Sequence, residues 1–258
     1  MSDVIDSVRL PDSLSLEGVG MRLGLSLTTL AVAIALAISA PIAVALYTLY
    51  LEGRRSQVDG VVAYAGDVLH RAESVWSQID FALEALESTP ACSPEQLVAM
   101  RRVDLESTYL QAVGRVDGTK LVCSSLDLGG RPLELGPVTA VEGDGTRIRT
   151  SVSFDFAEEP LLVVERDGYV AIVNKGVSTD SSLSIPGSSL AAILTDTGTV
   201  VASRGNVDGG WLDRLGSLTA GSYTRDGRVI AVIPSTKYPL AGLAAVPVAL
   251  VPSRMLGY

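Results

Sequence analysis

Two cysteines are the residues of this sequence with the clearest capacity for chemistry. Cys92 lies in the segment Pro90-Ala91-Cys92-Ser93-Pro94, and Cys123 follows 31 positions later in Leu121-Val122-Cys123-Ser124-Ser125-Leu126. A disulfide closing this interval would restrict the unfolded chain by about 3–4 kcal/mol in the loop-entropy model. From the residues alone, two buried free thiols, a purely structural disulfide and a redox-responsive pair all remain open.

The sequence offers few other residues that could serve in catalysis or bind a metal ion. The sole histidine, His70, stands beside Arg71 in a helical pattern, and no Gly-x-Ser-x-Gly sequence marks a hydrolase nucleophile. A zinc site needs three or four ligands, which two isolated cysteines and one histidine do not provide. Glu158 and Glu159 have no partner pattern and are interpreted as solvated. The sequence therefore predicts no catalytic residue, no metal and no cofactor, and His70 is interpreted as a surface or packing residue.

The length and net charge of the chain limit the number of domains and the kinds of partner that it can have. Its 258 residues suffice for one membrane anchor and one domain of ordinary size. A net charge of −9 without a basic cluster repels phosphate backbones, so nucleic acid is excluded as a partner.

An uncharged stretch from Leu23 to Leu51 follows a polar N-terminal tail of residues 1–22. It is long enough to cross the roughly 30 Å hydrocarbon core of a bilayer, and Tyr47 and Tyr50 stand where an interfacial belt would lie. The sequence predicts a transmembrane helix here, kinked at Pro41, with the lipid bilayer as its partner.

An alternative interpretation is a cleaved signal peptide, because small residues at 35–40 resemble a processing site. The mature chain would then begin near Pro41 and would be a secreted binding protein. The membrane orientation is not fixed by charge, because two arginines precede the span and two follow it: Arg9, Arg22, Arg54 and Arg55.

After the span, apolar residues recur in steps of three and four, which predicts an amphipathic helix of about thirty-five residues continuous with the membrane helix. The first row of its apolar face is Val58, Val61, Ala65, Val68, Ala72, Val75, Ile79, Ala82 and Leu86, and a second row is Val62, Leu69, Trp76 and Leu83. This face either packs on the chain's own sheet or pairs two copies in a homodimer. The tripeptide Glu84-Ala85-Leu86 within it is attributed to chance.

A short helix is predicted from Pro94 to Arg102, with Ser93 as its N-cap and Pro94 at its first position. Strand patterns follow, joined by turn signals at Asp117-Gly118, Asp167-Gly168 and Thr197-Gly198. The predicted strands are residues 109–116, 119–125, 147–154, 161–166, 169–174, 190–196, 200–203, 228–233 and 243–250, with loops at 126–146 and 177–189. The apolar segment from Leu240 to Val251 is too short to span a bilayer and is interpreted as the last strand.

This order of elements predicts an α+β fold: a long N-terminal helix followed by an antiparallel sheet domain, the profile of PAS-like or Cache-like extracytoplasmic sensors. Cys123 is expected on a strand. A cysteine pair so spaced would tie the end of the long helix to the sheet.

The cysteine segments carry a family resemblance. The chain resembles the CSS-motif sensory domain of EAL-type cyclic-di-GMP phosphodiesterases, most specifically between Pro90 and Ser125. The matching residues are Pro90-Ala91-Cys92-Ser93-Pro94, Leu97, Met100-Arg101, Tyr109, Val113, Arg115, Gly118 and Cys123-Ser124-Ser125.

The resemblance implies that Cys92 and Cys123 form a redox pair that switches between disulfide and free thiols, with periplasmic thiol-disulfide oxidoreductases as partners. Ser124 and Ser125 are carried over as motif neighbours without an assigned role. In that family the thiol state sets the activity of a cyclic-di-GMP phosphodiesterase, but this chain contains neither the EAL domain nor a second membrane helix, which puts any catalysis here in doubt.

The resemblance also implies an orientation in the inner membrane. Residues 1–22 are expected to form a cytoplasmic tail, 23–51 the transmembrane helix, 52–252 the periplasmic sensory domain and 253–258 a C-terminal tail. The expected function is a membrane-anchored redox-sensing module that regulates the hydrolysis of cyclic di-GMP. The alternative is a Cache-like small-ligand receptor domain in which the disulfide is structural.

Overall fold

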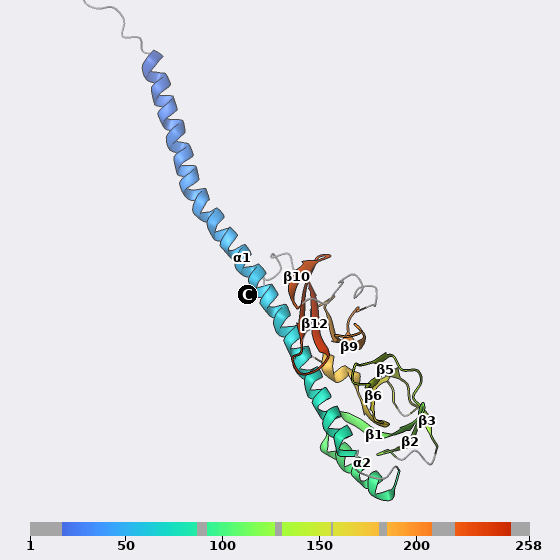
Figure 1. The fold of residues 1–258 in the computed structure, drawn as a ribbon. Helices are drawn as coiled ribbons and strands as arrows, with labels where there is room; N and C mark the ends of the chain where they lie inside the picture. The colour runs from blue at the N-terminus through green and yellow to red at the C-terminus, as the bar shows by residue number, and fades with distance from the viewer. Residues whose placement is uncertain are drawn as a thin grey trace, which may run out of the picture. The chain divides into compact units, whose positions relative to one another are not determined.

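The computed structural model describes residues 17–86, 92–126, 131–155, 157–180, 185–207 and 220–248, with side chains from residue 28 onward. The chain divides into two compact units, Met1–Gly53 and Arg54–Tyr258. Within the described residues, a single long helix, α1 (Glu17–Leu86), is followed by a second α-helix and twelve strands, all paired antiparallel (Figure 1). The predicted α+β fold, with a long N-terminal helix and an antiparallel sheet domain, is confirmed.

The part of α1 in the first unit is apolar and exposed. All its side chains from residue 28 to residue 52 are exposed, and the helix runs through Pro41 without interruption. Its most apolar window has a mean hydropathy of 2.4, and within the described residues α1 is the one helix long and apolar enough to cross a membrane.

The part of α1 in the second unit buries the predicted apolar face. Of its first row, the residues from Val61 to Leu86 are at most 3% exposed, and Val58 is partly buried against them. Of its second row, three residues are buried, whereas Val62 is 36% exposed. The prediction for Val62 was therefore wrong, because the helix makes slightly less than two full turns in seven residues and carries that position out of the face.

The strands form two sheets. The sequence pattern alone predicted an antiparallel sheet but not which strands pair with one another. The first has the order β3-β2-β1-β7-β6-β5-β4, and the second has the order β10-β11-β12-β8-β9. The first sheet contains β1 (Leu110–Asp117), β2 (Lys120–Ser124), β3 (Leu133–Glu134), β4 (Ala140–Val141), β5 (Arg147–Val152), β6 (Leu161–Arg166) and β7 (Tyr169–Val173). The second contains β8 (Ser189–Leu194), β9 (Val200–Arg204), β10 (Gly221–Arg225), β11 (Arg228–Pro234) and β12 (Leu240–Pro247). A 3₁₀ turn, η1 (Lys175–Thr179), leads from one sheet toward the other.

The main core lies between the second half of α1 and one face of each sheet, and the opposite face of each sheet has its own apolar cluster. The closest approach is at Gly242 of β12, where a Cβ would lie 2.2 Å from the carbonyl oxygen of Ala65 and 2.7 Å from the nitrogen of Leu69. A glycine is required here because any side chain would push the helix off the sheet.

A buried ion pair lies within the first sheet. The Arg149 side chain is 2% exposed, and its Nη1 lies 2.7 Å from Oε2 of Glu165, a buried residue on the neighbouring strand. Its Nε also donates to the carbonyl of Gly136 at 3.1 Å. The buried guanidinium therefore has both an ionic and a backbone partner.

Several sequence predictions need correction in their extent. The predicted loop 126–146 contains β3 and β4, and β10 lies where no strand was expected. The last strand runs from Leu240 to Pro247 instead of 243–250, because β12 pairs along its whole length with β11. The predicted short helix extends to Glu106, and residues 249–258 lie outside the described part of the chain.

Candidate functional site

A disulfide joins the two cysteines. The Cα atoms of Cys92 and Cys123 lie 5.8 Å apart, within the roughly 7 Å that a bridge allows without backbone movement. Cys123 is on β2, as expected for a strand residue. Cys92 lies immediately before α2 (Pro94–Glu106), six positions beyond the end of α1, so the bridge ties the start of α2 to β2 and does not join α1 directly.

Cys92 has an uncommon backbone conformation. Its φ of 55° lies in the left-handed region, which disfavours residues other than glycine by about 1–2 kcal/mol. The next residue, Ser93, begins α2 as its N-cap, because its hydroxyl accepts the backbone N–H of Gln96 at 3.1 Å. Cys92 thus lies in a turn, and α2 begins two residues later.

The Gln96 side chain connects this turn to the sheet. It is fully buried, its Oε1 accepts the backbone N–H of Cys92, and its Nε2 donates to the Tyr169 hydroxyl at 3.0 Å. The Tyr169 ring also lies under the Arg115 guanidinium, 4.8 Å from its centroid. Because Arg115 is the register partner of both Cys123 and Tyr169, one row across β2, β1 and β7 contains the bridge and its polar contacts.

The two serines after Cys123 attach the end of β2 to β1. The Ser124 hydroxyl donates to the carbonyl of Val113 at 3.0 Å, and the Ser125 hydroxyl accepts the N–H of Val113 at 3.1 Å. Burial raises the pKa of Asp104 on α2, and the nearby Ser125 side chain partly opposes the rise. Both serines are buried, and both of their hydroxyl groups are hydrogen-bonded to the backbone of Val113, as buried polar groups require.

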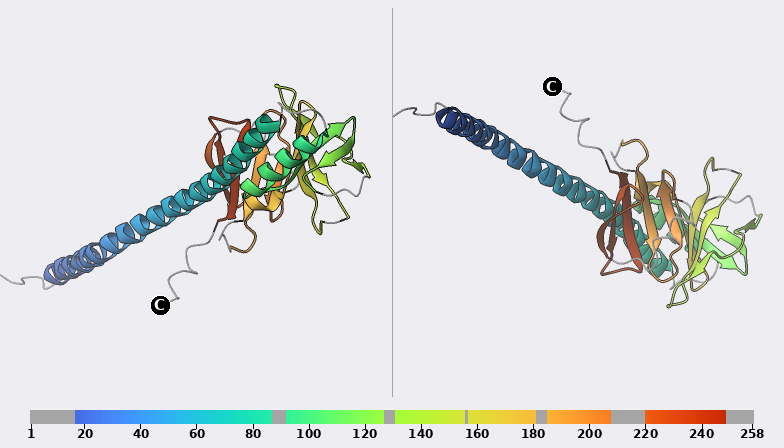
Figure 2. Two further views of the ribbon diagram at one scale, coloured as in Figure 1. Left: turned by 90° about the horizontal axis from the view of Figure 1, so that it is seen from below. Right: turned by 90° about the horizontal axis from the view of Figure 1, so that it is seen from above.

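Of these three consecutive residues, Cys123 therefore holds the turn before the first residue of α2, whereas Ser124 and Ser125 hold β2 to β1. The close approach of β2 requires Gly114 on β1, where a Cβ would lie 2.6 Å from the Cys123 carbonyl oxygen. Figure 2 shows α2 beside the last turns of α1, and buried residues of both helices belong to one core.

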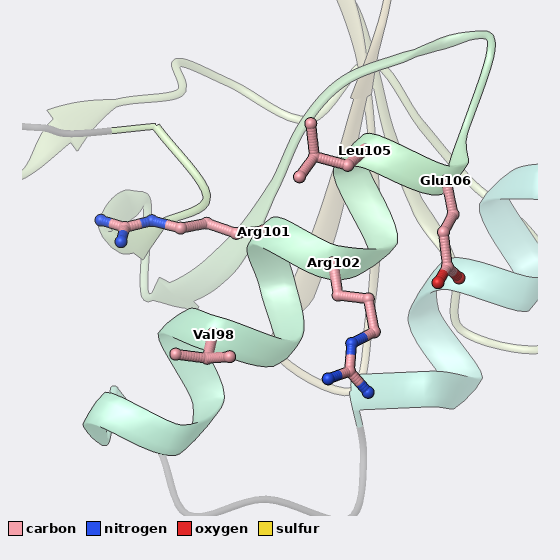
Figure 3. A pocket seen from close by; sticks show the side chains of 5 residues that line it. All are labelled: Val98, Arg101, Arg102, Leu105 and Glu106. Atoms are coloured by element: carbon pink, nitrogen blue, oxygen red, sulfur yellow. The ribbon is translucent and has the colours of Figure 1, made fainter.

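The opposite face of α2 borders a hollow of about 390 Å³. Its five lining side chains all come from α2 (Figure 3), namely Val98, Arg101, Arg102, Leu105 and Glu106. Val98 is 57% exposed and Leu105 is 87% exposed. The hollow is therefore a surface depression and not an enclosed ligand cavity.

The remaining residues considered from the sequence lie away from this site. His70 is exposed on α1, and Glu158 and Glu159 are exposed in the loop before β6. Among the residues that the structure describes, no group of three histidine, cysteine or acidic side chains is arranged to hold a metal ion.

The chemistry available to this site is thiol–disulfide exchange. The Cys92 residue is exposed and Cys123 is half-buried, so an incoming thiolate can approach the bridge from the Cys92 side. Sequence reasoning missed Gln96 and Tyr169, because a polar residue in a predicted surface helix gives no sign of a partner 73 positions away.

Comparison with known families places this site in context. Residues 59–258 match the model of the CSS motif domain associated with EAL. A protein of Escherichia coli K12, probable cyclic di-GMP phosphodiesterase PdeB, is 29% identical over 110 residues, which are 42% of this chain and 21% of that protein. The chain thus matches about a fifth of the length of this relative.

Solved structures of low similarity are sensory domains. The extracellular domain of rpHK1S-Z16 is 16% identical, with a TM-score of 0.49 over 77% of this chain and 95% of that one. The ligand-binding domain of the Campylobacter jejuni chemoreceptor Tlp3 is 10% identical, with a TM-score of 0.48 over 81% of this chain and 96% of that one. Neither a ligand nor a function is carried from these domains to this chain.

Proposed function

The chain belongs to the CSS-motif domain family associated with EAL, and we propose that it is a membrane-anchored periplasmic redox sensor that regulates the hydrolysis of cyclic di-GMP by an EAL domain. The observation that carries the proposal is the Cys92–Cys123 disulfide, which fixes the start of α2 through the motif itself. The hydrolytic activity would belong to the EAL domain with which this family is associated.

The proposed topology follows from the apolar first part of α1. Residues 23–51 would cross the inner membrane, with residues 1–22 in the cytoplasm and 52–252 in the periplasm. An oxidising compartment of this kind supports stable disulfides. The exposed face of α1 beyond the membrane would be available to a second copy, which makes a homodimer the expected assembly.

Reduction requires a dithiol protein, and a periplasmic thiol-disulfide oxidoreductase is the expected partner. A thiolate of that protein would attack Sγ of Cys92, forming a mixed disulfide and releasing the Cys123 thiolate, which takes up a proton. The second thiol of the partner would then resolve the mixed disulfide, leaving Cys92 as a thiol and the partner oxidised. Two electrons pass to the sensor, and oxidation by an oxidised partner reverses the steps.

The redox state would change the backbone at Cys92. In the disulfide form, the bridge holds Cys92 in the left-handed conformation, with its N–H bonded to Gln96. Without the bridge, the usual preference of a non-glycine residue favours a return to the right-handed or extended region. The Gln96 amide would then lose one partner and its orientation toward Tyr169, and α2 would move in its packing against α1.

The test uses membranes containing the product of the complete reading frame to which this sequence belongs. Thiols are trapped with a maleimide reagent, and cyclic di-GMP hydrolysis is measured in oxidised and reduced samples. We expect the oxidised protein to be unreactive, the reduced protein to take up two maleimides, and the hydrolysis rate to differ between them. Cys123→Ser is expected to show the reduced rate in both conditions.

Two results would overturn the proposal. One is that Cys92 and Cys123 keep the same state across the redox range of the periplasm, either as a disulfide that is never reduced or as thiols that never form the disulfide. The other is a hydrolysis rate that is the same in both redox states and in Cys123→Ser but responds to a small metabolite, which would favour the ligand-receptor function with a structural disulfide.

A further inference from the structure

Glu142 is a buried carboxyl group without a hydrogen-bond partner for one of its oxygens. It lies in the turn between β4 and β5, where its N–H donates to the carbonyl of Thr146 at 2.9 Å and its own carbonyl accepts the N–H of Gly145 at 3.0 Å. Its residue is 8% exposed, and Oε1 has no partner within the described part of the chain. A buried ionised carboxylate left in this condition is strongly destabilising.

The charges around Glu142 increase this destabilisation. Three carboxylates act on it from three elements: Asp144 in its own turn, Asp196 in the turn between β8 and β9 of the other sheet, and Asp80 on α1. The guanidinium of Arg166 on β6 lies 2.9 Å from Asp80 and also interacts with Asp144. Arg166 is thus already engaged by other acids.

A proton is the cation that suits this position. No group of three acidic, histidine or cysteine side chains among the described residues could hold a metal ion. Protonation removes the charge of Glu142 without requiring space for an ion and supplies an O–H donor in a region rich in carboxylate acceptors.

We propose that Glu142 is a proton-sensitive contact at the junction of the two sheets and α1, closed when its carboxyl is neutral and released when it ionises. This regulation goes beyond redox sensing and does not depend on the disulfide. The hairpin that carries Glu142 suits the role, because β4 is a two-residue edge strand whose strand partner in the described sheet is β5 alone.

The Glu142 carboxyl titrates near neutral pH. Burial, and next the charges of Asp144, Asp196 and Asp80, raise the pKa of Glu142 from its ordinary value of 4.5 to about 7. Because the folded state holds the proton more tightly than the unfolded state, the contact is fully stable below about pH 4.5 and weakens as the pH rises to 7 and above.

The experiment measures thermal unfolding of the full chain in detergent micelles between pH 5 and pH 8, with the disulfide kept oxidised. We expect the Tm of the wild type to fall by roughly 5 °C over this range. Glu142→Gln, which mimics the neutral form, should lose this dependence. Glu159→Gln is the matched control, because Glu159 is exposed, and it should follow the wild type.

A second variant keeps the test decisive if Glu142→Gln does not fold. Asp196→Asn removes one of the charges that raise the pKa of Glu142, and it should shift the midpoint of the Tm change to lower pH. Deuterium exchange of residues 140–149, corrected for the intrinsic rate, should increase above pH 7 in the wild type. Equal pH profiles in the wild type and whichever of these two variants folds would overturn the proposal.

Discussion

Removal of the disulfide should lower the stability of the second unit by an amount that can be worked from the structure. The bridge closes an interval of 31 positions, which corresponds to about 3–4 kcal/mol in the loop-entropy model. Without the bridge, Cys92 can leave its φ of 55°, and relief of this unfavourable conformation would stabilise the variant by about 1 kcal/mol. We therefore expect Cys123→Ser to reduce the free energy of unfolding by about 2–3 kcal/mol.

The assay is urea unfolding of the full chain in detergent micelles, followed by tryptophan fluorescence. Trp76 is 5% exposed in the main core, so its emission should report the loss of packing between α1 and the sheets. Reduced wild type and Cys123→Ser should have the same midpoint, below that of the oxidised wild type. The slope should rise as well, because the unbridged denatured chain is less compact.

The backbone contribution at Cys92 can be separated from the loop entropy. Cys92→Gly and Cys92→Ala both remove the bridge, but only glycine adopts the left-handed region freely. If the turn before α2 keeps its conformation without the bridge, the glycine variant should be the more stable of the two. If the turn relaxes, alanine should be equal or better, because glycine gives the unfolded chain more freedom.

The reasoning would be refuted by a Cys123→Ser midpoint that matches the oxidised wild type. It would also be refuted by reduced wild type that keeps its full stability while Cys123→Ser loses it, because the loss would then come from the substitution and not from the bridge. Hydrogen exchange gives a local check: on reduction, the exchange rates of the α2 amides should rise by a larger factor than those of β11 and β12, which follow only the change in global stability.

The remaining predictions concern close packing and the motif serines. Gly242→Ala should lower the free energy of unfolding by about 2 kcal/mol or more in the urea assay, because its Cβ would lie 2.2 Å from the Ala65 carbonyl oxygen. Gly60→Ala on α1 is the control: it has no atom within 4 Å and should stabilise the helix slightly. Ser125→Ala should cost about 1–2 kcal/mol, because it leaves the Val113 N–H without its side-chain acceptor; an unchanged midpoint would contradict this.

Turn chemistry explains which strands the sequence located. Asp167 and Gly168 have φ values of 53° and 80°, and they join β6 to β7 as the dipeptide predicted. Asp226 and Gly227 have φ values of 51° and 68° and join β10 to β11 in the same way. The sequence prediction missed β10 despite this signal, because no side chain of that strand is buried and it shows no apolar alternation.

Local sequence patterns could not predict which residues far apart in the chain contact one another. Periodicity indicated that residues 110–117 form a strand, but their pairing with β7 spans more than fifty positions and depends on the sheet as a whole. The same limit applies to the site. The cysteine spacing suggested a bridge, whereas the burial of Gln96 and Glu142 follows from contacts that only the folded chain brings together.

The position of the bridge constrains how a redox change can reach α1. The disulfide joins the start of α2 to β2 and not to α1, but Met100 and Val103 of α2 lie in the same core as Leu86, the last residue of α1. Nearby, the Gln78 side chain on α1 accepts the N–H groups of Thr108 and Tyr109 at the start of β1. Because a close-packed core transmits displacement instead of absorbing it, a shift of α2 must either move the last turns of α1 or break these contacts with Gln78. Moving the end of α1 retains every one of its helical hydrogen bonds, so the expected response to reduction is a displacement of an intact helix and not its unfolding.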